Sequence, residues 1–423
     1  MKHVVLGNGP AGVIAAETIR KHAPRDEIML VGDEPEPPYS RMAIPYLLAG
    51  NIDEQGTYLR KGKDHFAAQR IELRIGRAKS ADSAKRAVRL ADGTTLAFDR
   101  LLIATGSSPA RLPIEGIDLP GVHSCWTLAD ARKIMALARP GARVLQMGAG
   151  FIGCIIMESL VSRGVALTVV EMGDRMVPRM MGEGAGGMIR RWVAGKGVLV
   201  HTSTRVEAIQ ASGSALSIRL SNGVKVDADL VISATGVRPN IGFLQDSGIA
   251  CAHGVMTDEY LQTNVQGIYA AGDCAEALDV SSGKHVVSAI QPNAADEARC
   301  AAMNMAGKRV ALRGVTQINI LDTLGLISTS FGQWQGVPGG EHAELSDPAN
   351  FRFLRLEFDG DVLVGANSVG LTEHVGVLRG MIQTRLKLGP WKDRLLRDPL
   401  ALMEVYLASA QTQSERGPRP RVR

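Results

Sequence analysis

The chain has 423 residues, 45% of them hydrophobic and 22% charged, and a formal net charge of +5. This length and composition predict a globular protein of two or three domains. They exclude a membrane-spanning class, because no apolar run reaches about 18 residues, and the dispersed basic residues, without interleaved aromatics, argue against nucleic acid binding. The 5 cysteines form no CxxC pair, so we expect no metal site and no local redox disulfide.

The N-terminal stretch has the pattern of a complete strand–turn–helix–strand unit. A short apolar strand leads into GNGPAG at 7–12, then a helix over about 11–21 and a second strand over 28–31. Such glycines allow a tight turn, close approach of the backbone to a pyrophosphate, and close packing of helix on strand. The acids after the second strand, Asp33 and Glu34, can accept ribose hydroxyls. The unit predicts a dinucleotide site, with a plain βα turn as the alternative.

Three segments continue this first predicted domain. Prolines and aromatics over 35–50 predict a loop and a short helix rather than a further strand. Alternating apolar residues over 71–89 predict a small antiparallel ribbon that turns at 91–93. A buried strand then ends in the turn Ala-Thr-Gly at 104–106, and such a strand end borders the ligand crevice of an open α/β sheet.

A second copy of the opening pattern occupies 143–171. A strand runs into GAGFIG at 148–153, and a helix and a strand lead to Glu171. Two such units imply two nucleotides, or one internal repeat that serves two related ligands. The carboxylate of Glu171 favours a free ribose 2′-hydroxyl over a 2′-phosphate, so we expect NADH rather than NADPH at this unit. Arg175 can either meet a phosphate or cap a loop.

Two further motifs follow the second unit. A strand ends in ATGVRP at 234–239, which echoes ATGSSP at 104–109 and extends the repeat to the closing strands. GIYAAGDCA at 267–275 places Asp273 at the start of a turn or helix. There its carboxylate can accept hydrogen bonds from a polyol or act as a helix N-cap.

The remaining elements are predicted from alternation and helical periodicity. They are a β-meander over 198–226, a helix over about 293–305, strands over 317–320, 324–331, 351–358 and 362–367, and helices over about 372–388 and 399–409. The region after 316 has no phosphate loop. Its strands carry apolar residues on more than one face, as expected of a part that packs on a neighbour or on a second subunit.

The motifs resemble those of the flavin-dependent pyridine nucleotide–disulfide oxidoreductase superfamily, over the whole chain except its tail. GNGPAG and GAGFIG, each with its acid, ATGVRP and GIYAAGDCA carry the resemblance. It implies an α/β fold with two Rossmann-like dinucleotide-binding domains, as in glutathione reductase, and a C-terminal α+β interface domain. It further implies FAD on the first unit, NAD(P)H on the second, and a homodimer.

The resemblance also assigns boundaries and roles. The implied domains are 1–115 with 240–312 for FAD, 116–239 for NAD(P)H, 313–410 for the interface, and 411–423 as a disordered basic tail. Glu34 would hold the adenosine ribose and Asp273 the ribityl chain. The residues expected to bind FAD are Gly7, Gly9, Pro10, Ala11, Gly12, Asp33, Glu34, Arg41, Ala104, Thr105, Gly106, Gly272 and Asp273. Those expected to bind NAD(P)H are Gly148, Gly150, Phe151, Ile152, Gly153, Glu171, Ala234, Thr235 and Gly236.

The segment after Glu34 separates the branches of this superfamily. Relatives that reduce disulfides, peroxide or oxygen carry a redox cysteine where this chain has Met42, and a thioether cannot become a thiolate nucleophile. The Pro-Pro-Tyr-x-Arg run at 37–41 instead resembles NADH:rubredoxin reductases and the flavin part of assimilatory nitrite reductases. Arg41 is then expected near FAD, with a surface salt bridge as the alternative. Ile155 replaces a glutamate that contacts the nicotinamide in many relatives.

Three functions remain open. The first is an FAD-dependent oxidoreductase that passes hydride from NADH to FAD, and electrons on to a rubredoxin- or ferredoxin-like protein or a small molecule, with no catalytic side chain required. The second is a coenzyme A disulfide or thiol–disulfide reductase that uses Cys274, or an NADH oxidase. The third is an NADH-sensing flavoprotein with little turnover. Because the first strand begins almost at Met1, no secretory signal fits, and we expect a cytoplasmic protein.

Overall fold

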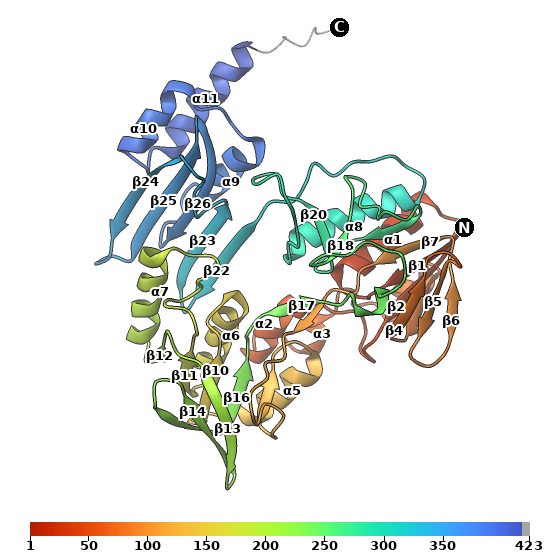
Figure 1. Cartoon of the computed structure of the whole chain (residues 1–423), viewed down its shortest axis with the longest axis horizontal. Helices are drawn as coiled ribbons and strands as arrows, with labels where there is room; N and C mark the ends of the chain where they lie inside the picture. Colours follow the sequence, from red (N-terminus) through yellow and green to blue (C-terminus); the bar gives the residue numbers. More distant parts are fainter. Residues whose placement is uncertain (417–423) are drawn as a thin grey trace. The chain divides into compact units, whose positions relative to one another are not determined.

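A computed structural model describes residues 1–416, and the side chains of residues 1–411. The described chain forms two compact units (Figure 1). Unit 1 comprises 1–111, 126–132 and 236–315, and unit 2 comprises 112–125, 133–235 and 316 onward. None of the helices within residues 1–416 combines the length and the apolar character that crossing a bilayer requires. The predicted boundaries between three domains stay predictions.

Unit 1 is built on a five-stranded parallel sheet. Apolar residues alternate between its faces: Val5 and Leu102 pack beneath helices α1 and α8, whereas Val4 and Leu101 face an antiparallel ribbon. The strands, in spatial order, are β19 (Ile268–Ala270), β7 (Arg100–Ile103), β1 (Lys2–Leu6), β2 (Glu27–Gly32) and β3 (Ile71–Ile75). The helices are α1 (Pro10–His22), α2 (Ile44–Leu48), α3 (Glu54–Thr57), α4 (His65–Ala68) and α8 (Gln291–Met305), with the 3-10 turns η1 (Arg41–Ala43) and η2 (Gly242–Leu244).

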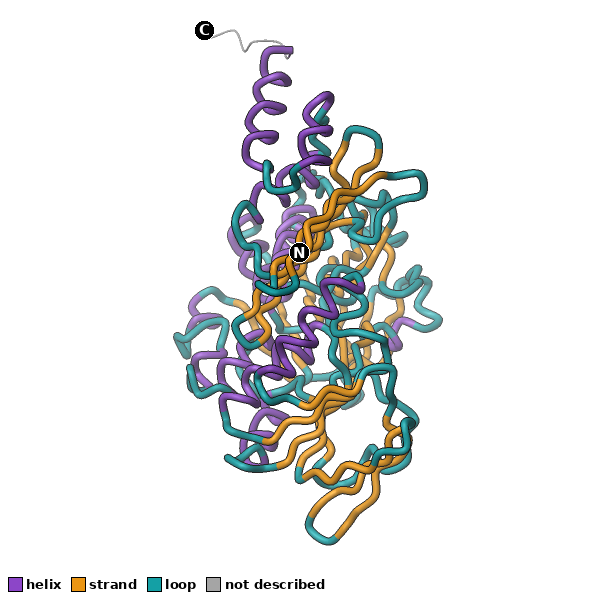
Figure 2. The backbone as a smooth tube through the Cα atoms, turned by 90° about the vertical axis from the view of Figure 1, so that its left-hand side faces the viewer, coloured by secondary structure: helices purple, strands orange, loops and turns teal. Residues whose placement is uncertain are grey.

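Unit 2 contains a second five-stranded parallel sheet, whose strands other than the edge strand at 122–124 are arranged in the same order as in unit 1. The parallel strands 143–147 and 166–170 are joined by a helix, as a parallel pair requires (Figure 2, helices purple and strands orange). The strands, in spatial order, are β9 (Val122–Ser124), β16 (Leu230–Ser233), β10 (Arg143–Met147), β11 (Ala166–Val170) and β12 (Leu199–His201). The helices are α5 (Leu128–Leu137), which begins in unit 1, α6 (Phe151–Ser162) and α7 (Glu183–Gly195).

Each parallel sheet is accompanied by a three-stranded antiparallel sheet. The sequence expectation of a ribbon over 71–89 is partly wrong, because 71–75 form the parallel edge strand β3 and the ribbon starts only at 78. The predicted meander over 198–226 likewise begins later, at 206. The ribbons are β4 (Ala78–Asp82), β5 (Ala87–Leu90) and β6 (Thr95–Ala97) in unit 1, and β13 (Val206–Ser212), β14 (Ala215–Leu220) and β15 (Lys225–Ala228) in unit 2.

The chain after 316 adds an antiparallel five-stranded sheet to unit 2. It contains a charged edge strand, β24, which the sequence did not reveal because only Ala343 in it is buried. Helix α11 runs past its predicted end at 409 to Arg416, and the rest of the predicted disordered tail lies outside the described residues. The strands, in spatial order, are β22 (Ile318–Thr323), β23 (Leu326–Gly332), β26 (Val362–Val369), β25 (Arg352–Asp359) and β24 (Glu341–Asp347), and the helices are α9 (Val375–Thr384), the 3-10 turn η3 (Gly389–Trp391), α10 (Lys392–Arg397) and α11 (Leu402–Arg416).

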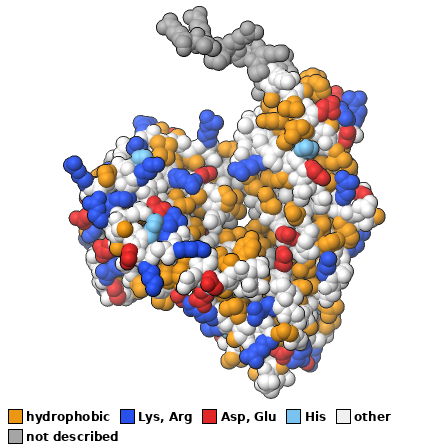
Figure 3. Space-filling model, turned by 180° about the vertical axis from the view of Figure 1, so that it is seen from behind, with side chains coloured by type: hydrophobic (Ala, Val, Ile, Leu, Met, Phe, Trp, Pro, Cys, Tyr) orange, Lys and Arg blue, Asp and Glu red, His pale blue; other side chains and the backbone are white. Residues whose placement is uncertain are grey.

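Short strands complete unit 1. The two echoing motifs meet here: β8 (Ser107–Pro109) pairs antiparallel with β17 (Val237–Pro239). The others are β18 (Val255–Met256), β20 (Ala275–Leu278) and β21 (His285–Val286). On the face of the described chain seen in Figure 3, lysines and arginines are intermixed with acidic and apolar side chains, in keeping with the weak basic balance of the sequence.

Candidate nucleotide-binding sites

The first glycine-rich turn is shaped by backbone contacts at two glycines. Gly7 has a φ of +106°, and a Cβ there would lie 2.0 Å from the Ala104 carbonyl oxygen. A Cβ at Gly12 would lie 1.7 Å from the carbonyl oxygen of Gly7. At Gly9, in contrast, a Cβ would meet nothing within 4 Å, so this residue borders open space.

Helix α1 begins at this open space. Gly9 is its N-cap and offers no side-chain cap, and Pro10 occupies the first turn, where its missing N–H is not needed. The backbone N–H groups of the first helical turn, including those of Ala11 and Gly12, are therefore available to an anion, and the helix dipole favours one. An open space in front of an uncapped helix start fits the pyrophosphate of a dinucleotide.

The two acids after β2 have different surroundings. Asp33 is largely exposed, and its carboxylate lies 3.7 Å from the Arg77 guanidinium. Glu34 is held more firmly, because Tyr39 Oη donates a hydrogen bond to its Oε2 at 2.7 Å and Arg41 Nη2 to its Oε1 at 2.7 Å. Burial raises the pKa of Tyr39, so the phenol stays a hydrogen-bond donor. Glu34 is thus pre-positioned as a fixed acceptor.

Arg41 joins this acid to a distant segment of unit 1. Its Nη1 donates to the Trp126 carbonyl oxygen at 2.8 Å, and its guanidinium lies 5.4 Å from the centre of the Trp126 ring. The Trp126 indole N–H in turn donates to the Ser107 carbonyl oxygen at 3.0 Å. The salt bridge that the sequence offered as the alternative role of Arg41 is formed, with Glu34 as its partner, and it is part of a larger hydrogen-bonded network. Tyr39 and Trp126 were not singled out in the sequence, although Tyr39 lies in the Pro-Pro-Tyr run.

The turn at 104–106 lies beside the first glycine turn, since Ala104 N donates to the Leu6 carbonyl oxygen at 2.8 Å. Thr105 and Asn240 exchange two hydrogen bonds, at 2.8 and 2.9 Å, and lock the turn to the start of the returning segment. Ser107 Oγ donates to Asp273 Oδ2 at 3.0 Å. The chain therefore brings three sequence-separated motifs together at the carboxyl edge of the sheet.

Asp273 is partly buried, and burial raises the pKa of its carboxyl, an effect that Ser107 and Arg41 partly oppose. A second carboxyl, Glu297, lies next to it on α8 and accepts a hydrogen bond from Gly272 N at 2.6 Å. Glu297 was not predicted as a site residue from the sequence. Helical periodicity could have revealed it, because Glu297 shares the buried face of α8 with Ala294, Ala298 and Ala301, where an acid is unexpected.

The second glycine-rich turn reproduces the first. Gly148 has a φ of +97°, and a Cβ there would lie 2.5 Å from the Ala234 carbonyl oxygen. A Cβ at Gly153 would lie 2.4 Å from the Gly148 carbonyl oxygen, whereas at Gly150 it would meet nothing within 4 Å. Gly150 caps α6 without a side-chain bond, so the helix start at Phe151 and Ile152 is open.

Glu171 is only 9% exposed, and both of its oxygens are engaged by the backbone. Oε2 accepts from Ala149 N at 2.7 Å, and Oε1 accepts from Gly173 N at 2.7 Å. Each carboxylate oxygen has a further lone pair, so a ribose hydroxyl can still donate to it. Arg175 binds the Met181 carbonyl oxygen and Asp174, which supports the loop-capping alternative for this residue.

The ATG turn at 234–236 is divided between the units. Ala234 N donates to the Met147 carbonyl oxygen at 2.8 Å, and Thr235 Oγ1 lies 3.3 Å from Ser233 Oγ, both within unit 2. Gly236 belongs to unit 1, where its carbonyl oxygen accepts from Ala110 N at 2.8 Å. The nucleotide role of all three residues remains a prediction.

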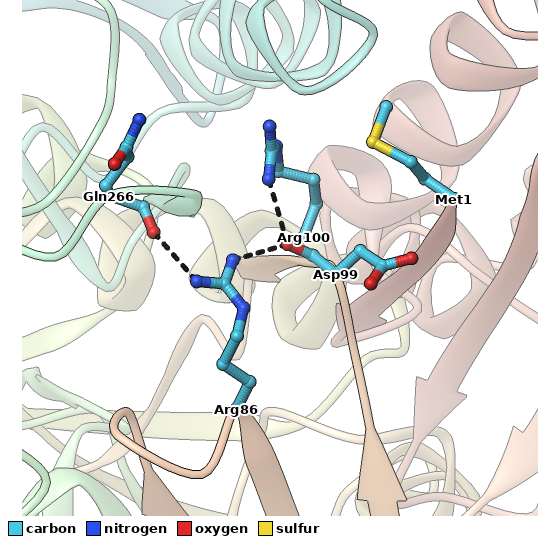
Figure 4. A pocket seen from close by; sticks show the side chains of 5 residues that line it. All are labelled: Met1, Arg86, Asp99, Arg100 and Gln266. Atoms are coloured by element: carbon cyan, nitrogen blue, oxygen red, sulfur yellow. Dashed lines mark hydrogen bonds between the residues drawn. The ribbon is translucent and has the colours of Figure 1, made fainter.

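A separate shallow pocket of about 420 Å³ lies at the opposite edge of the first sheet, lined by Met1, Arg86, Asp99, Arg100 and Gln266 (Figure 4). Both guanidinium groups point at the Asp99 carbonyl oxygen, at 2.5 and 3.1 Å. Because β1 and β7 start here, the pocket is remote from the glycine turn that follows their carboxyl ends. No group of three or more metal-ligating side chains occurs within the described part of the chain.

Comparison with known proteins agrees with this geometry. The profile of the pyridine nucleotide-disulphide oxidoreductase family matches residues 1–298. The chain belongs to this family. Subunit epsilon of the NADH-dependent phenylglyoxylate dehydrogenase of Aromatoleum evansii is 32% identical, over 95% of this chain and 96% of that one. Rhodocoxin reductase of Rhodococcus erythropolis is 34% identical, over 74% of each chain.

A solved structure shares the fold over nearly the full length. It is the covalent putidaredoxin reductase–putidaredoxin complex, with a TM-score of 0.88 and 25% identity, over 97% of this chain and 99% of that one. These findings confirm the predicted α/β fold and the predicted family. They also confirm an oxidoreductase that uses NADH and FAD, cofactors which the two open helix starts fit.

The thiol chemistry of some family members is not supported in this member. Met42 is 47% exposed and carries no thiol. Cys274 is 0% exposed, and burial raises the pKa of its thiol to about 11. Its single S–H lies within donating distance of two carbonyl oxygens, those of Ile103 at 3.4 Å and Ala271 at 3.5 Å. A buried, protonated thiol cannot act as a nucleophile at neutral pH, so the disulfide-reductase hypothesis based on Cys274 loses its physical basis.

Proposed function

We propose that this chain exchanges electrons between NADH and a small redox protein, through FAD bound in unit 1. The observation that carries the proposal is the pair of uncapped helix starts, at Gly9 and Gly150, in a chain whose Met42 and Cys274 supply no reactive thiolate. When bound, FAD takes a hydride from NADH and passes its electrons on singly or in pairs. Electrons would therefore leave the flavin directly.

The proposed residue roles follow from what each group can donate or accept. Gly9 and the first turn of α1 would bind the pyrophosphate of FAD, and Glu34, fixed by Tyr39 and Arg41, would accept its adenosine ribose hydroxyls. Asp273 would accept the ribityl hydroxyls. The equivalent groups in unit 2 are Gly150 for the pyrophosphate of NADH and Glu171 for its ribose.

Two relatives guide the choice of acceptor. One is named for its partner rhodocoxin, and the other is a reductase solved in covalent complex with putidaredoxin. The acceptor proposed for this chain is accordingly a ferredoxin- or rubredoxin-like protein. Transfer can run in either direction, since each step of such an exchange is reversible.

A second candidate is the NADH-reacting subunit of a larger dehydrogenase. It is favoured by the phenylglyoxylate dehydrogenase subunit, which aligns over 96% of its own length. In that case the acceptor is a partner subunit rather than a freely diffusing protein. Tight co-purification of an iron–sulfur subunit at equal stoichiometry would support it, and a chain that is fully active with an added ferredoxin would argue against it.

The test is an anaerobic titration of purified, FAD-loaded protein with NADH and then NADPH, followed by addition of a [2Fe–2S] ferredoxin. We expect NADH to bleach the flavin at lower concentration than NADPH, and the ferredoxin to restore the flavin spectrum. Gly9→Ala should fold but retain little FAD, because its Cβ fills open space rather than protein. Gly150→Ala, the matched variant, should keep FAD and respond poorly to NADH.

Two outcomes would contradict the proposal. A protein that binds no flavin would remove the basis of the proposal. A flavin that NADH reduces only over many minutes would favour the NADH-sensing alternative, to which the apolar Ile155 gives weight. The finer expectations of a homodimer and of a cytoplasmic location are part of the same proposal. Light scattering of the FAD-loaded protein tests the first of them.

A further inference from the structure

Glu297 is a buried carboxyl that helps to shape the turn carrying Asp273. It is 1% exposed, and its Oε2 accepts a hydrogen bond from Gly272 N at 2.6 Å. Gly272 has a φ of +81°, and a Cβ there would lie 3.3 Å from that of Ala11. The bond therefore fixes a tightly packed left-handed turn between β19 and β20, directly before Asp273.

The described side chains place no cation on this carboxyl. Among residues 1–411, no lysine, arginine or histidine forms an ion pair with Glu297. The nearest charged groups that act on it are themselves acids, Asp273 on the turn and Asp296 on its own helix. Arg41 acts on Asp273, and Asp296 is exposed and paired with Arg299. A carboxylate at Glu297 would thus be buried beside a second carboxylate.

The other elements packed around α8 offer no compensation either. Helix α1 presents a buried apolar face, and its acid Glu17 is paired with Arg60 and His65. Strand β19 contributes Tyr269, a phenol whose pKa is raised by burial. On α8 itself, Cys300 is a thiol whose pKa burial raises to about 11. These groups are neutral or already paired, so none of them supplies positive charge to Glu297.

Physical chemistry then favours the neutral acid. Transfer of an unpaired carboxylate out of water disfavours the charged form, and a like charge nearby disfavours it further. Burial accordingly raises the pKa of Glu297 to about 8, with Asp273 and Asp296 adding to the effect. A single hydrogen bond from Gly272 N does not offset this.

We propose that Glu297 keeps a proton beside the turn that carries Asp273, and that it thereby sets how many protons accompany reduction of the flavin. This inference rests on the proposed FAD site. Glu297 is a positioning residue, since it acts through Gly272 and Asp273. Hydride from NADH delivers two electrons and one proton, and it leaves one additional negative charge on the bound group. That charge makes proton uptake by a nearby carboxylate more favourable, and the proton comes from solvent.

The sign of the effect follows. Below pH about 8 Glu297 already holds its proton before and after reduction, so it contributes nothing to the pH dependence. Above that pH it is ionised in the oxidised protein and takes up one proton on reduction, up to the higher pKa that the added negative charge gives it in the reduced protein. For a two-electron couple, one extra proton adds about 30 mV per pH unit to the slope of the midpoint potential.

The experiment compares the FAD-loaded wild type, Glu297→Gln and the control Asp296→Asn. Midpoint potentials are measured from pH 6 to 10, and the infrared band of a protonated carboxylic acid is recorded with and without FAD. We expect a steeper slope above pH about 8 in the wild type, the same steeper slope with a slightly lower onset in Asp296→Asn, and its loss in Glu297→Gln. The infrared band should likewise be missing only in Glu297→Gln.

Equal slopes and an unchanged band in Glu297→Gln would overturn the inference, even if the protein binds and reduces FAD normally. Failure to bind FAD at all would instead overturn the proposed function. If Glu297→Gln does not fold, wild-type protein labelled with ¹³C-glutamate keeps the test decisive. The carboxylic acid band must then move to lower frequency with the label and vanish as the pH rises through about 8.

Discussion

The two glycine-rich turns of this chain have the same backbone pattern, but different residues fill the space beneath them. Gly7 N donates to Val31 O at 2.7 Å and Gly148 N to Val170 O at 2.8 Å, so β1 and β2 match β10 and β11 residue by residue. In this match Asn8 corresponds to Ala149, and Gly32 corresponds to Glu171. The side chains around the two turns nevertheless differ.

A small space beneath each turn is filled from opposite sides. In unit 1, a Cβ at Gly32 would lie 2.2 Å from Asn8 Nδ2, so the turn residue fills the space and the strand residue must be small. In unit 2, Ala149 is small and the carboxylate of Glu171 fills the space, bonded to Ala149 N. The first turn consequently presents its acid two residues later, as Glu34. The same motif thus does not specify where its carboxylate lies.

The largest effects should come from the third glycine of each turn. Gly12→Ala places a Cβ 1.7 Å from a backbone oxygen, and Gly153→Ala places one at 2.4 Å. Backbone must move in both, so we expect losses above about 3 kcal/mol in the free energy of unfolding, with the larger loss at Gly12. Urea unfolding measures this. Gly9→Ala is the control, and an equal loss there would contradict the steric explanation.

The filled space can be tested next. Gly32→Ala should cost about 1–3 kcal/mol, because the new methyl group collides with Asn8. Asn8→Ala in the same chain should restore much of this stability, since it recreates the small turn residue of unit 2. A double-mutant cycle measures the coupling. Strictly additive effects would show that Asn8 is not the group that excludes a side chain at position 32.

Glu171→Gln should have a smaller effect, on the order of 1 kcal/mol, because one oxygen still accepts from the backbone while a charge-assisted bond is lost. We expect weaker NADH binding, a smaller preference for NADH over NADPH, and an unchanged FAD content. Fluorescence titration with both nucleotides measures this. A variant that loses FAD but keeps its nucleotide preference would assign Glu171 to the stability of the chain instead.

The first strands of the two units differ in how they make stability depend on pH, because the titratable His3 of unit 1 corresponds to Val144 of unit 2. His3 is 0% exposed and its pKa is lowered, mainly by burial, although Nε2 bonds Asp26 at 2.8 Å. The unfolded chain therefore binds a proton below pH 6.5 that the folded chain resists, and stability should fall as the pH drops through that value. His3→Gln should remove this component in thermal unfolding between pH 5 and 8. An identical pH profile would contradict the assignment.

The smallest effect is expected at Gln146, which corresponds to Val5. Its Nε2 donates to the Gly148 carbonyl oxygen at 2.9 Å, and its buried Oε1 has no hydrogen-bond partner within the described chain. Gln146→Val loses one neutral hydrogen bond and removes one unpaired oxygen, terms that nearly cancel within about 1 kcal/mol. A much larger loss in urea unfolding would mean that the Gln146 bond is needed to shape the second turn.

Much of the fold could be predicted because its signals are local. Apolar strands, glycine turns and helical periodicity lie within single stretches of about 30 residues, as in 4–34 and 143–171, and a parallel unit of that size constrains its own topology. The strands that were misjudged, β3, β12 and β24, lack such signals. Each lies at a sheet edge, where one neighbour and partial solvent exposure weaken the alternation.

The placement of the candidate sites was also within reach of the sequence, because only glycine tolerates the backbone conformations at Gly7 and Gly148. The surroundings of the acidic residues could not be predicted from the sequence. Stacking of Arg41 on Trp126, 85 residues away, and hydrogen bonding of Asp273 by Ser107, 166 residues away, depend on which segments the sheet brings together.

The sequence by itself therefore determined the two nucleotide units, their order, and the absence of a thiol at position 42. Only the tertiary structure decided that Glu171 is bound by backbone amides, that Glu34 is fixed by Tyr39 and Arg41, and that Glu297 lies beside Asp273 with no cation paired to it among the described side chains. The physical reason is that backbone conformation is set by neighbours in the chain. The charge state of an acid is set by desolvation and by partners that only folding brings near.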